Sequence, residues 1–404
     1  MRYYDCLIVG SGHGGSQAAQ SLRQHNFAGS IALLGEESDP PYHRPPLSKE
    51  YLEGDRDFES ILIRPRDFWE SRNVTMLLGN RVEKIDPVRR HVTCANGAVY
   101  GYSRLVWAAG GKPRNVSCPG TDLAGVHTVR TRADVDSITA NLRQTERVAI
   151  IGGGYIGLET AAVLSKLGKR VTILEAMDRV LARVAGSLLS KFYETEHRAH
   201  GVDIQLGVRI ERLEGSAGRV SGVLLSNGRI VPAQLVIVGI GIVPSVEPLI
   251  AAGAAGTDGV DVDQFCRTTL PEVYAVGDCA RHVNEYAAGS AVRLESVQNA
   301  TQQALVAAKA IAGQPVPYKV VPTFWSKQYD LRLQTAGLSI GHDQTILRGD
   351  LGKRQFAIVY LRRGRVIALD CINTPKDYLK GQALIAKDPS PSVDPLADLK
   401  VALD

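Results

Sequence analysis

Cysteine is scarce in this chain, and its arrangement excludes whole classes of site. Six of the 404 residues are cysteines, at positions 6, 94, 118, 266, 279 and 371. No two of them form a C-x-x-C pair, and none has the spacing of half a metal site. We therefore expect no metal centre and no disulfide framework. Reduced, partly buried thiols are typical of cytoplasmic proteins.

Long apolar runs and a strong net charge are also missing. No run approaches the roughly 20 residues that cross a membrane, and the first predicted strand begins so near Met1 that we expect no signal peptide. The formal net charge is only +5, without a basic tract. We therefore expect a cytoplasmic protein that binds neither nucleic acid nor membrane. The length predicts two or three domains rather than one core.

A glycine-rich turn near the N-terminus is the feature around which the chain is organised. The apolar strand Cys6–Val9 leads into Gly10-x-Gly12-x-x-Gly15, followed by a helix, a second short strand and Glu36. Glycines at these positions allow a tight turn, a close approach to a pyrophosphate and helix packing on the strand. The acid follows at about the spacing that contacts a ribose. This pattern predicts a dinucleotide site, although a tight turn in an ordinary α/β sheet is the alternative.

The same pattern recurs in the middle of the chain. A strand ends at Gly152-x-Gly154-x-x-Gly157, a helix follows, and Glu175 closes the next strand. A carboxylate at this position binds a ribose 2′-hydroxyl and repels a 2′-phosphate, so we expect NADH. Because two arginines, at 179 and 183, lie close downstream and could attract a 2′-phosphate, NADPH is disfavoured rather than excluded.

The segment after the first unit is a stiff loop rich in proline. Four prolines between positions 40 and 46 exclude a regular helix or a central strand there. The loop carries two cations, Arg44 and Lys49. It holds side chains in place at low entropic cost, whether around a ligand or as a rigid surface loop with solvated charges.

The order of strands and turns predicts three domains. The Asn96-Gly97 turn predicts a hairpin between Arg90–Cys94 and Val99–Tyr100, and a separate strand that begins at Leu105 ends in a glycine turn. An apolar strand near 235–244 returns the chain after the second unit. Alternating short strands and a final helix follow residue 322. We expect an α/β fold with two Rossmann-like domains and a C-terminal α+β domain. The predicted ranges are 1–111 with 244–321 (FAD, discontinuous), 112–243 (NAD) and 322–404 (C-terminal).

Two dinucleotide sites in one chain suggest one bound flavin and one exchangeable nicotinamide. Hydride passes between the two rings only if they stack, so the two domains are expected to face each other. The cofactor then performs the chemistry, and the protein positions and tunes it.

Several further segments are typical of one particular family. They are Arg44-Pro-Pro-Leu-Ser-Lys49, Gly157-x-Glu159, Val276-Gly-Asp-Cys-Ala280, Glu295-Ser-Val-Gln-Asn-Ala300 and Phe324-Trp-Ser-Lys-Gln-Tyr-Asp330. Together with the two glycine motifs, they resemble the oxygenase-coupled, NADH-dependent ferredoxin reductases, which are glutathione-reductase-like flavoproteins. The resemblance covers nearly the whole chain. It implies transfer of electrons from NADH through FAD to a [2Fe-2S] ferredoxin that serves a cytochrome P450 or a ring-hydroxylating oxygenase, with transient, electrostatic docking.

The resemblance also implies roles for single residues. The implied FAD-binding residues are Gly10, Gly12, Gly14, Gly15, Glu36, Arg44, Lys49, Val82, Ala109, Gly110, Asp278, Val297 and Trp325. The implied NAD-binding residues are Gly152, Gly154, Tyr155, Ile156, Gly157, Glu159, Glu175, Gly241 and Glu295. Lys49, Glu159 and Trp325 are the implied catalytic residues, and Lys49 and Glu159 are expected to form an ion pair beside the flavin. Relatives usually have threonine in place of Ala109.

Three of these residues also have simpler explanations. Asp278 could cap the following helix, Trp325 could be plain core, and Glu159 could be a first-turn charge favoured by the helix dipole.

Two other functions share this architecture. Disulfide reductases need a redox cysteine beside the flavin, and no cysteine lies between Cys6 and Cys94. Proteins of the apoptosis-inducing-factor type share the Arg44–Lys49 segment and act partly as NADH sensors. An NADH sensor of this type and another NADH-dependent flavin reductase stay open as alternatives.

For ferredoxin docking we expect a basic face, made of Arg64, Arg66, Lys327, Arg332, Lys353 and Arg354.

Overall fold

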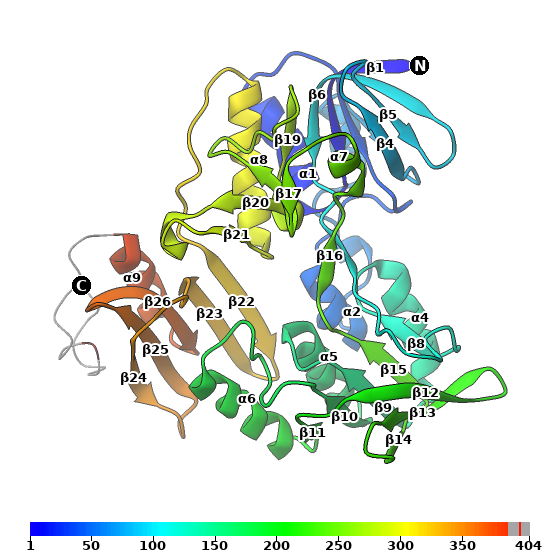
Figure 1. The fold of residues 1–404 in the computed structure, drawn as a ribbon, viewed down its shortest axis with the longest axis vertical. Coiled ribbons are helices and arrows are strands. Elements are labelled where there is room, and N and C mark those ends of the chain that lie inside the picture. The colour runs from blue at the N-terminus through cyan, green and yellow to red at the C-terminus, as the bar shows by residue number, and fades with distance from the viewer. Residues whose placement is uncertain (387–395, 397–404) are drawn as a thin grey trace. The chain divides into compact units, whose positions relative to one another are not determined.

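The computed structural model describes residues 1–386 and 396, and within them the chain forms two compact units (Figure 1). The first unit comprises Met1–His43, Phe58–Lys112 and Val243–Phe324. The second comprises Arg44–Asp57, Pro113–Ile242 and Trp325 onward. Arg44 and Lys49 thus belong to the second unit. The finer division into three domains stays a prediction.

The first unit is built on a seven-stranded sheet in the order β3-β2-β1-β6-β5-β4, with β19 beside β6. Its strands are β1 (Arg2–Val9), β2 (Ile31–Leu34), β3 (Val74–Leu77), β4 (Val82–Asp86), β5 (His91–Cys94), β6 (Val99–Trp107) and β19 (Val273–Ala275). β1, β2, β3, β6 and β19 run parallel, whereas β4, β5 and β6 pair antiparallel. The parallel part therefore has the arrangement expected of a dinucleotide-binding sheet.

β6 corrects one expectation from the sequence. Two separate strands were expected, one after the Asn96-Gly97 turn and one beginning at Leu105, but the structure has one continuous nine-residue strand. Its first half pairs antiparallel with β5, and Leu105–Trp107 also pair with β19. The polar residues between the two apolar stretches do not interrupt the strand, because the backbone stays paired through them.

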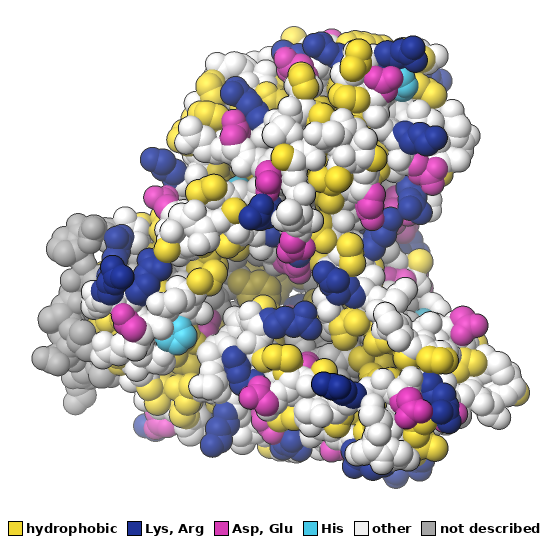
Figure 2. Space-filling view, viewed as in Figure 1, with side chains coloured by type: hydrophobic (Ala, Val, Ile, Leu, Met, Phe, Trp, Pro, Cys, Tyr) yellow, Lys and Arg dark blue, Asp and Glu magenta, His cyan; other side chains and the backbone are white. Residues whose placement is uncertain are grey.

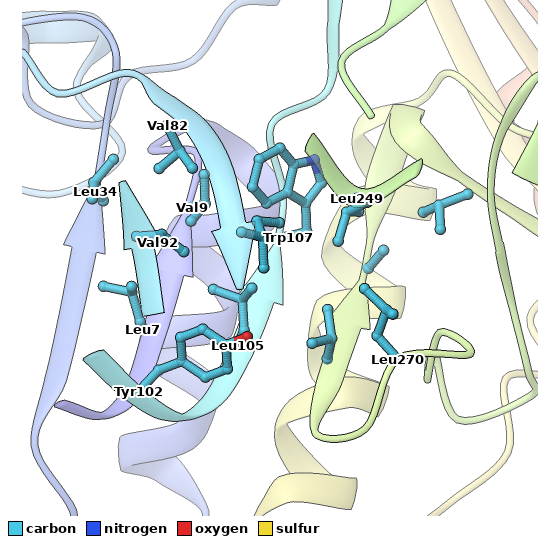
Figure 3. Packing of buried hydrophobic residues seen from close by; sticks show 14 of the residues in the cluster. Leu7, Val9, Leu34, Val82, Val92, Tyr102, Leu105, Trp107, Leu249 and Leu270 are labelled. Atoms are coloured by element: carbon cyan, nitrogen blue, oxygen red, sulfur yellow. The ribbon is translucent and has the colours of Figure 1, made fainter. Parts of the chain in front are cut away.

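Both faces of this sheet are covered. α1 (His13–Gln24) and α8 (Val297–Ile311) pack against each other on one face through small residues, among them Ala18, Ala19, Ala304 and Ala307. The other face carries an apolar cluster that includes Leu7, Leu105 and Leu249 (Figure 3). α7 (Glu247–Ala251) supplies Leu249 to this cluster. Burial on both faces explains why Cys6–Val9 of β1 and the whole of β2 are apolar.

The first unit also contains a smaller sheet in the order β17-β18-β20-β21. Its strands are β17 (Gly256–Thr257), β18 (Gly259–Val262), β20 (Ala280–Val283) and β21 (Ala291–Arg293). The short helices of this unit are η2 (Glu59–Ile61), α3 (Phe68–Ser71), η3 (Gly277–Cys279) and η4 (Glu285–Ala287).

The second unit contains a five-stranded, wholly parallel sheet in the order β11-β10-β9-β15-β8. Its strands are β8 (Val126–Thr128), β9 (Arg147–Ile151), β10 (Arg170–Leu174), β11 (Asp203–Gln205) and β15 (Leu235–Val238). The helices are η1 (Pro45–Ser48), α2 (Glu50–Glu53), α4 (Arg132–Leu142), α5 (Tyr155–Lys166) and α6 (Ser187–Ala199). Three antiparallel strands are appended, β12 (Ile210–Ser216), β13 (Arg219–Leu225) and β14 (Ile230–Pro232). The chain passes from one unit to the other within β7 (Gly111–Pro113) and within β16 (Ile242–Pro244).

The C-terminal part is a five-stranded sheet in the order β22-β23-β26-β25-β24, followed by one helix. The elements are β22 (Thr323–Gln328), β23 (Leu331–Gly337), β24 (Gln344–Asp350), β25 (Gln355–Arg362), β26 (Arg365–Ile372) and α9 (Pro375–Ala386). The change to an α+β pattern after residue 322 is confirmed. Among the described residues, no helix has the length and apolar character to cross a bilayer.

Candidate active site

The first glycine motif forms the tight link between β1 and α1. Gly10 has φ +107°, and a Cβ there would lie 2.2 Å from the Ala108 carbonyl oxygen. A Cβ on Gly15 would lie 1.8 Å from the Gly10 carbonyl oxygen. Gly12 is the N-cap of α1 and has no side-chain capping bond. The helix N-terminus is thus left to an external anion, the arrangement that binds a pyrophosphate.

The other residues implied for FAD in the first unit lie at strand ends and turns. Glu36 is exposed and lies 3.9 Å from Arg81, whereas Val82 is buried at the start of β4. Gly110 has φ +63°. Asp278 lies in η3, directly after β19. It does not cap α8, since Ser296 does so.

The second glycine motif repeats this geometry between β9 and α5. Gly152 has φ +105°, and a Cβ there would lie 2.5 Å from the Gly239 carbonyl oxygen. A Cβ on Gly157 would lie 2.2 Å from the Gly152 carbonyl oxygen. Gly154 is the N-cap of α5, again without a side-chain cap. Both units therefore present the same uncapped helix N-terminus.

Glu175 ties the end of β10 to the second glycine turn. One carboxylate oxygen accepts a hydrogen bond from the Gly153 N–H at 2.6 Å, and the other accepts from the Met177 N–H at 2.8 Å. The side chain is largely buried. Each oxygen keeps a second lone pair, so the carboxylate can still accept from a ribose hydroxyl. Arg179 is occupied elsewhere, because its guanidinium donates to the carbonyls of residues 182 and 185 and to Ser190.

The remaining residues implied for NAD are divided between the two units. Tyr155 and Ile156 follow Gly154 in α5, where Ile156 is exposed and burial raises the pKa of Tyr155. Gly241 has φ +94° and is exposed in the second unit. Glu295 belongs to the first unit, where it pairs with Arg293 at 2.7 Å.

Lys49 and Glu159 form the ion pair that the resemblance predicts. Their side chains are 8% and 3% exposed. The Glu159 carboxylate also accepts from the Ser48 hydroxyl at 2.6 Å and from the Ser326 hydroxyl at 2.7 Å. Such burial rules out a solvated first-turn helix charge. A buried ion pair is tolerated only when its remaining polar atoms are bonded, as they are here.

Trp325 lies next to this pair at the start of the C-terminal sheet. Its ring centroid is 5.3 Å from the Lys49 ammonium, within the range of a cation–π contact. The side chain is 49% exposed, so it is not plain core. Arg44, in the same stiff loop as Lys49, donates to the Arg130 carbonyl at 2.6 Å. Whether the residues implied for FAD and NAD contact those cofactors stays a prediction.

Sequence reasoning missed two members of the cluster, Ser48 and Ser326. Both stand inside motifs that were recognised, in Leu-Ser-Lys49 and Trp325-Ser. Their signal was available only indirectly, because a buried glutamate needs more donors than one lysine provides. No rule of spacing shows that residues 48, 159 and 326 meet.

None of the cysteines has the environment of a reactive thiol. All six are free, and five of them are buried. Burial raises the pKa of Cys6 and of Cys279 to about 12, and it also raises the pKa of the other four thiols. A thiol with a raised pKa is a poor nucleophile at neutral pH. Within residues 1–386 no group of histidines, cysteines and acids could hold a metal ion.

Three of the six cations in the expected basic face pair with acids, and a fourth bonds a neutral side chain. Arg64 donates to Gln20 at 2.8 Å. Three others pair with acids: Arg66 with Glu59, Lys327 with Glu50, and Arg354 with Asp330 and Glu196. Cations and acids also lie interspersed on the surface that Figure 2 shows. The six residues therefore do not act as six unpaired charges, and exposed pairs of this kind are screened by salt.

Comparison with known proteins places this geometry in a family. Residues 4–304 match the model of the pyridine nucleotide-disulphide oxidoreductases, and residues 323–404 match a reductase C-terminal domain. The chain is 55% identical to the ferredoxin reductase subunit of a 5,5′-dehydrodivanillate O-demethylase from Sphingobium sp. strain NBRC 103272 / SYK-6, over 100% of this chain and 98% of the relative.

Two solved structures are similar over almost the whole chain. The ferredoxin reductase for the CYP199A2 system of Rhodopseudomonas palustris has a TM-score of 0.95 and 36% identity, covering 99% of this chain and 98% of that one. A covalent complex of putidaredoxin reductase with putidaredoxin also gives 0.95, at 38% identity and 98% and 96% coverage. The chain belongs to the pyridine nucleotide-disulphide oxidoreductase family. Within it, the chain falls among the ferredoxin reductases of oxygenase systems.

The residues present fit the cofactors of this family, FAD and a nicotinamide dinucleotide. Each glycine turn leaves a helix N-terminus without a side-chain cap, and each is followed by an acid at the end of the next strand. Backbone N–H groups at such a terminus satisfy a pyrophosphate, and the acid satisfies a ribose. The two units thus provide two sites of the same chemical kind.

Proposed function

We propose that this protein oxidises NADH and passes the electrons singly to a [2Fe-2S] ferredoxin that serves a cytochrome P450 or another oxygenase. The observation that carries the proposal is the pairing of two uncapped dinucleotide turns with the buried Lys49–Glu159 pair, in a chain without a reactive thiol. A flavoprotein that lacks a thiol relay must release its electrons from the flavin itself.

Bound FAD supplies a ring that accepts a hydride and gives up single electrons. The protein's part is to bind and orient. The β1–α1 turn holds the FAD pyrophosphate, and the β9–α5 turn holds that of NADH. Lys49 presents a fixed cation, because Glu159, the Pro45 carbonyl and the Ser48 hydroxyl leave its ammonium little freedom. The exposed Trp325 lies against that cation, which suits a residue at the rim of the site.

The coenzyme preference rests on Glu175. A second negative charge near a buried carboxylate is repelled, so a 2′-phosphate is disfavoured. Arg179 would be the natural partner of such a phosphate, but its donors are already bound to the protein. NADH is therefore the coenzyme that this site accepts.

We also propose a cytoplasmic location, on the basis of the free cysteines. Six thiols without a disulfide are typical of proteins from a reducing compartment.

Rapid mixing under anaerobic conditions tests the proposal. NADH-reduced protein is mixed with an oxidised [2Fe-2S] ferredoxin, and flavin reoxidation is followed, with free disulfides as the control acceptor. Reoxidation by ferredoxin at about ten per second, the range of ordinary enzymes, is the expected result. A reduced flavin that persists for minutes with several ferredoxins, together with a long-lived charge-transfer band, would instead identify an NADH sensor.

A further inference from the structure

A continuous chain of hydrogen bonds leaves Glu159 and passes into the core of the second unit. The Ser326 hydroxyl bonds Glu159 at 2.7 Å, and the Gln328 amide bonds Ser326 at 3.2 Å. The His197 ring then meets Gln328 at 2.8 Å and Tyr329 at 3.0 Å. The chain joins α5, β22 and α6, and none of its last three members was expected from the sequence to serve the site.

The chemistry of the groups fixes the direction of every bond. An ionised carboxylate only accepts, so Ser326 must give its single proton to Glu159. The Gln328 atom that faces Ser326 must then be the donating nitrogen, which turns the Gln328 oxygen toward His197. That oxygen only accepts, so His197 carries its proton on Nε2. Its Nδ1 is left as an acceptor, and the Tyr329 hydroxyl donates to it.

The surroundings of His197 agree with this neutral tautomer. The side chain is fully buried, and burial lowers its pKa to about 4. A positive charge on the next turn, at His200, would lower it further. The His200 ring stacks on Tyr329 at 3.7 Å, which fixes the outer end of the chain. At neutral pH all donors therefore point toward Glu159.

We propose that His197 is a positioning residue for the reaction with NADH, acting on Glu159 through Gln328 and Ser326. Aligned donors polarise one another, so the chain stabilises the negative charge of Glu159 more than the Ser326 hydroxyl would alone. It also holds β22, and with it Trp325, in one register against α6. The proposal rests on the proposed function, since it takes Glu159 as part of the site that meets NADH.

The first test examines the chain of hydrogen bonds through the protonation of His197, in the absence of catalysis. The protein with bound FAD is labelled with ¹⁵N-histidine, and the His197 signals are assigned as those missing from His197→Gln. We expect a protonated Nε2, an unprotonated Nδ1 and no titration between about pH 5.5 and 8. Glu159→Gln removes the charge at the end of the chain and should move the Nε2–H signal. The opposite tautomer, or a signal that ignores Glu159→Gln, would overturn the proposal.

The second test separates the donor from the packing. His197→Gln keeps an N–H near the Nε2 position, whereas His197→Leu fills similar space without one. In anaerobic mixing at saturating NADH we expect flavin reduction to slow by about 3- to 10-fold in His197→Leu, the size of one hydrogen bond, and by about 2-fold at most in His197→Gln. Equal rates in the two variants would reduce His197 to a packing residue.

The outcomes of both tests are distinct from those of the proposed function. Neither test contains a ferredoxin, so failure to reduce a ferredoxin leaves both readouts intact. If His197→Leu does not fold, Tyr329→Phe removes only the outermost hydroxyl. It should shift the His197 Nδ1 signal and slow flavin reduction by about 2-fold. If neither the Nδ1 signal nor the rate of flavin reduction changed, the proposed role of the hydrogen-bond chain would be refuted.

Discussion

Removing both members of the Lys49–Glu159 pair should cost less stability than the sum of the two single losses. Lys49→Met leaves the Glu159 carboxylate buried, and loss of one partner of a buried pair costs about 3–5 kcal/mol. The hydroxyls of Ser48 and Ser326 still bond that carboxylate. We therefore expect a loss of unfolding free energy near the lower end, about 3 kcal/mol.

The double variant Lys49→Met/Glu159→Gln contains no buried charge at this position. Its stability loss should fall short of the sum of the single losses by about 2–3 kcal/mol, the coupling energy of two residues in one network. Urea unfolding followed by circular dichroism, at one fixed excess of FAD, measures all four proteins of the cycle. Additivity within about 0.5 kcal/mol would show that the two side chains do not interact, and the reasoning would be refuted.

The remaining predictions concern other parts of the chain. Gly152→Ala should lower NADH affinity at least tenfold, because its Cβ meets the Gly239 carbonyl. The control Gly168→Ala, at φ +75° in open space, should cost only about 1–2 kcal/mol of stability. Titration calorimetry checks the affinity, and scanning calorimetry checks the stability. Glu175→Ala should weaken NADH binding about 10- to 100-fold and narrow its advantage over NADPH, measured by equilibrium titration. Burial holds the pKa of His197 and of His282 at about 4, so from pH 6.5 down to 4 the unfolded chain binds protons that the native protein does not. Unfolding free energy should fall by about 1.4 kcal/mol per pH unit for each histidine, and a flat profile in urea titrations between pH 7 and 5 would contradict this. Iodoacetamide at pH 7.5 should leave NADH-to-ferredoxin activity intact, since the thiols are protonated and mostly buried; rapid loss of activity would revive thiol chemistry.

The strands and glycine turns of the two dinucleotide motifs could be predicted from the sequence, although β1 begins at Arg2 rather than at Cys6. The helices expected after the two glycine motifs are α1 and α5, and the strands expected before Glu36 and Glu175 are β2 and β10. The reason is local. A buried parallel strand, a glycine turn and a helix each leave a signal within a few neighbouring residues.

Features that depend on distant residues were less accessible. The sequence divided β6 into two strands, because its partners β1, β5 and β19 are far apart in the chain and only pairing shows its continuity. The acidic partners of the basic residues were hidden for a related reason. The acids that neutralise Arg354, at positions 196 and 330, are not its sequence neighbours.

The chain of hydrogen bonds from Glu159 to Tyr329 is the feature that could least be predicted from the sequence. Ser326 and Gln328 are two residues apart in β22, so both side chains lie on one face of the strand. That regularity shows which residues of β22 are neighbours, but not that His197 of α6 completes the row. The contact between His197 of α6 and Gln328 of β22 depends on the tertiary structure, which a local sequence pattern does not show.

The energetics of the Lys49–Glu159 pair agree with the chemical role that we propose for it. Apolar residues of similar volume often stabilise a fold as well as a buried ion pair does, or better. Here the pair is retained together with two serines, a glutamine and a neutral histidine, all buried and all hydrogen-bonded. A fold that needed only stability would not require this set. A fixed cation beside a fixed anion, next to the exposed Trp325, fits the role that we propose for this cluster in orienting a reacting dinucleotide.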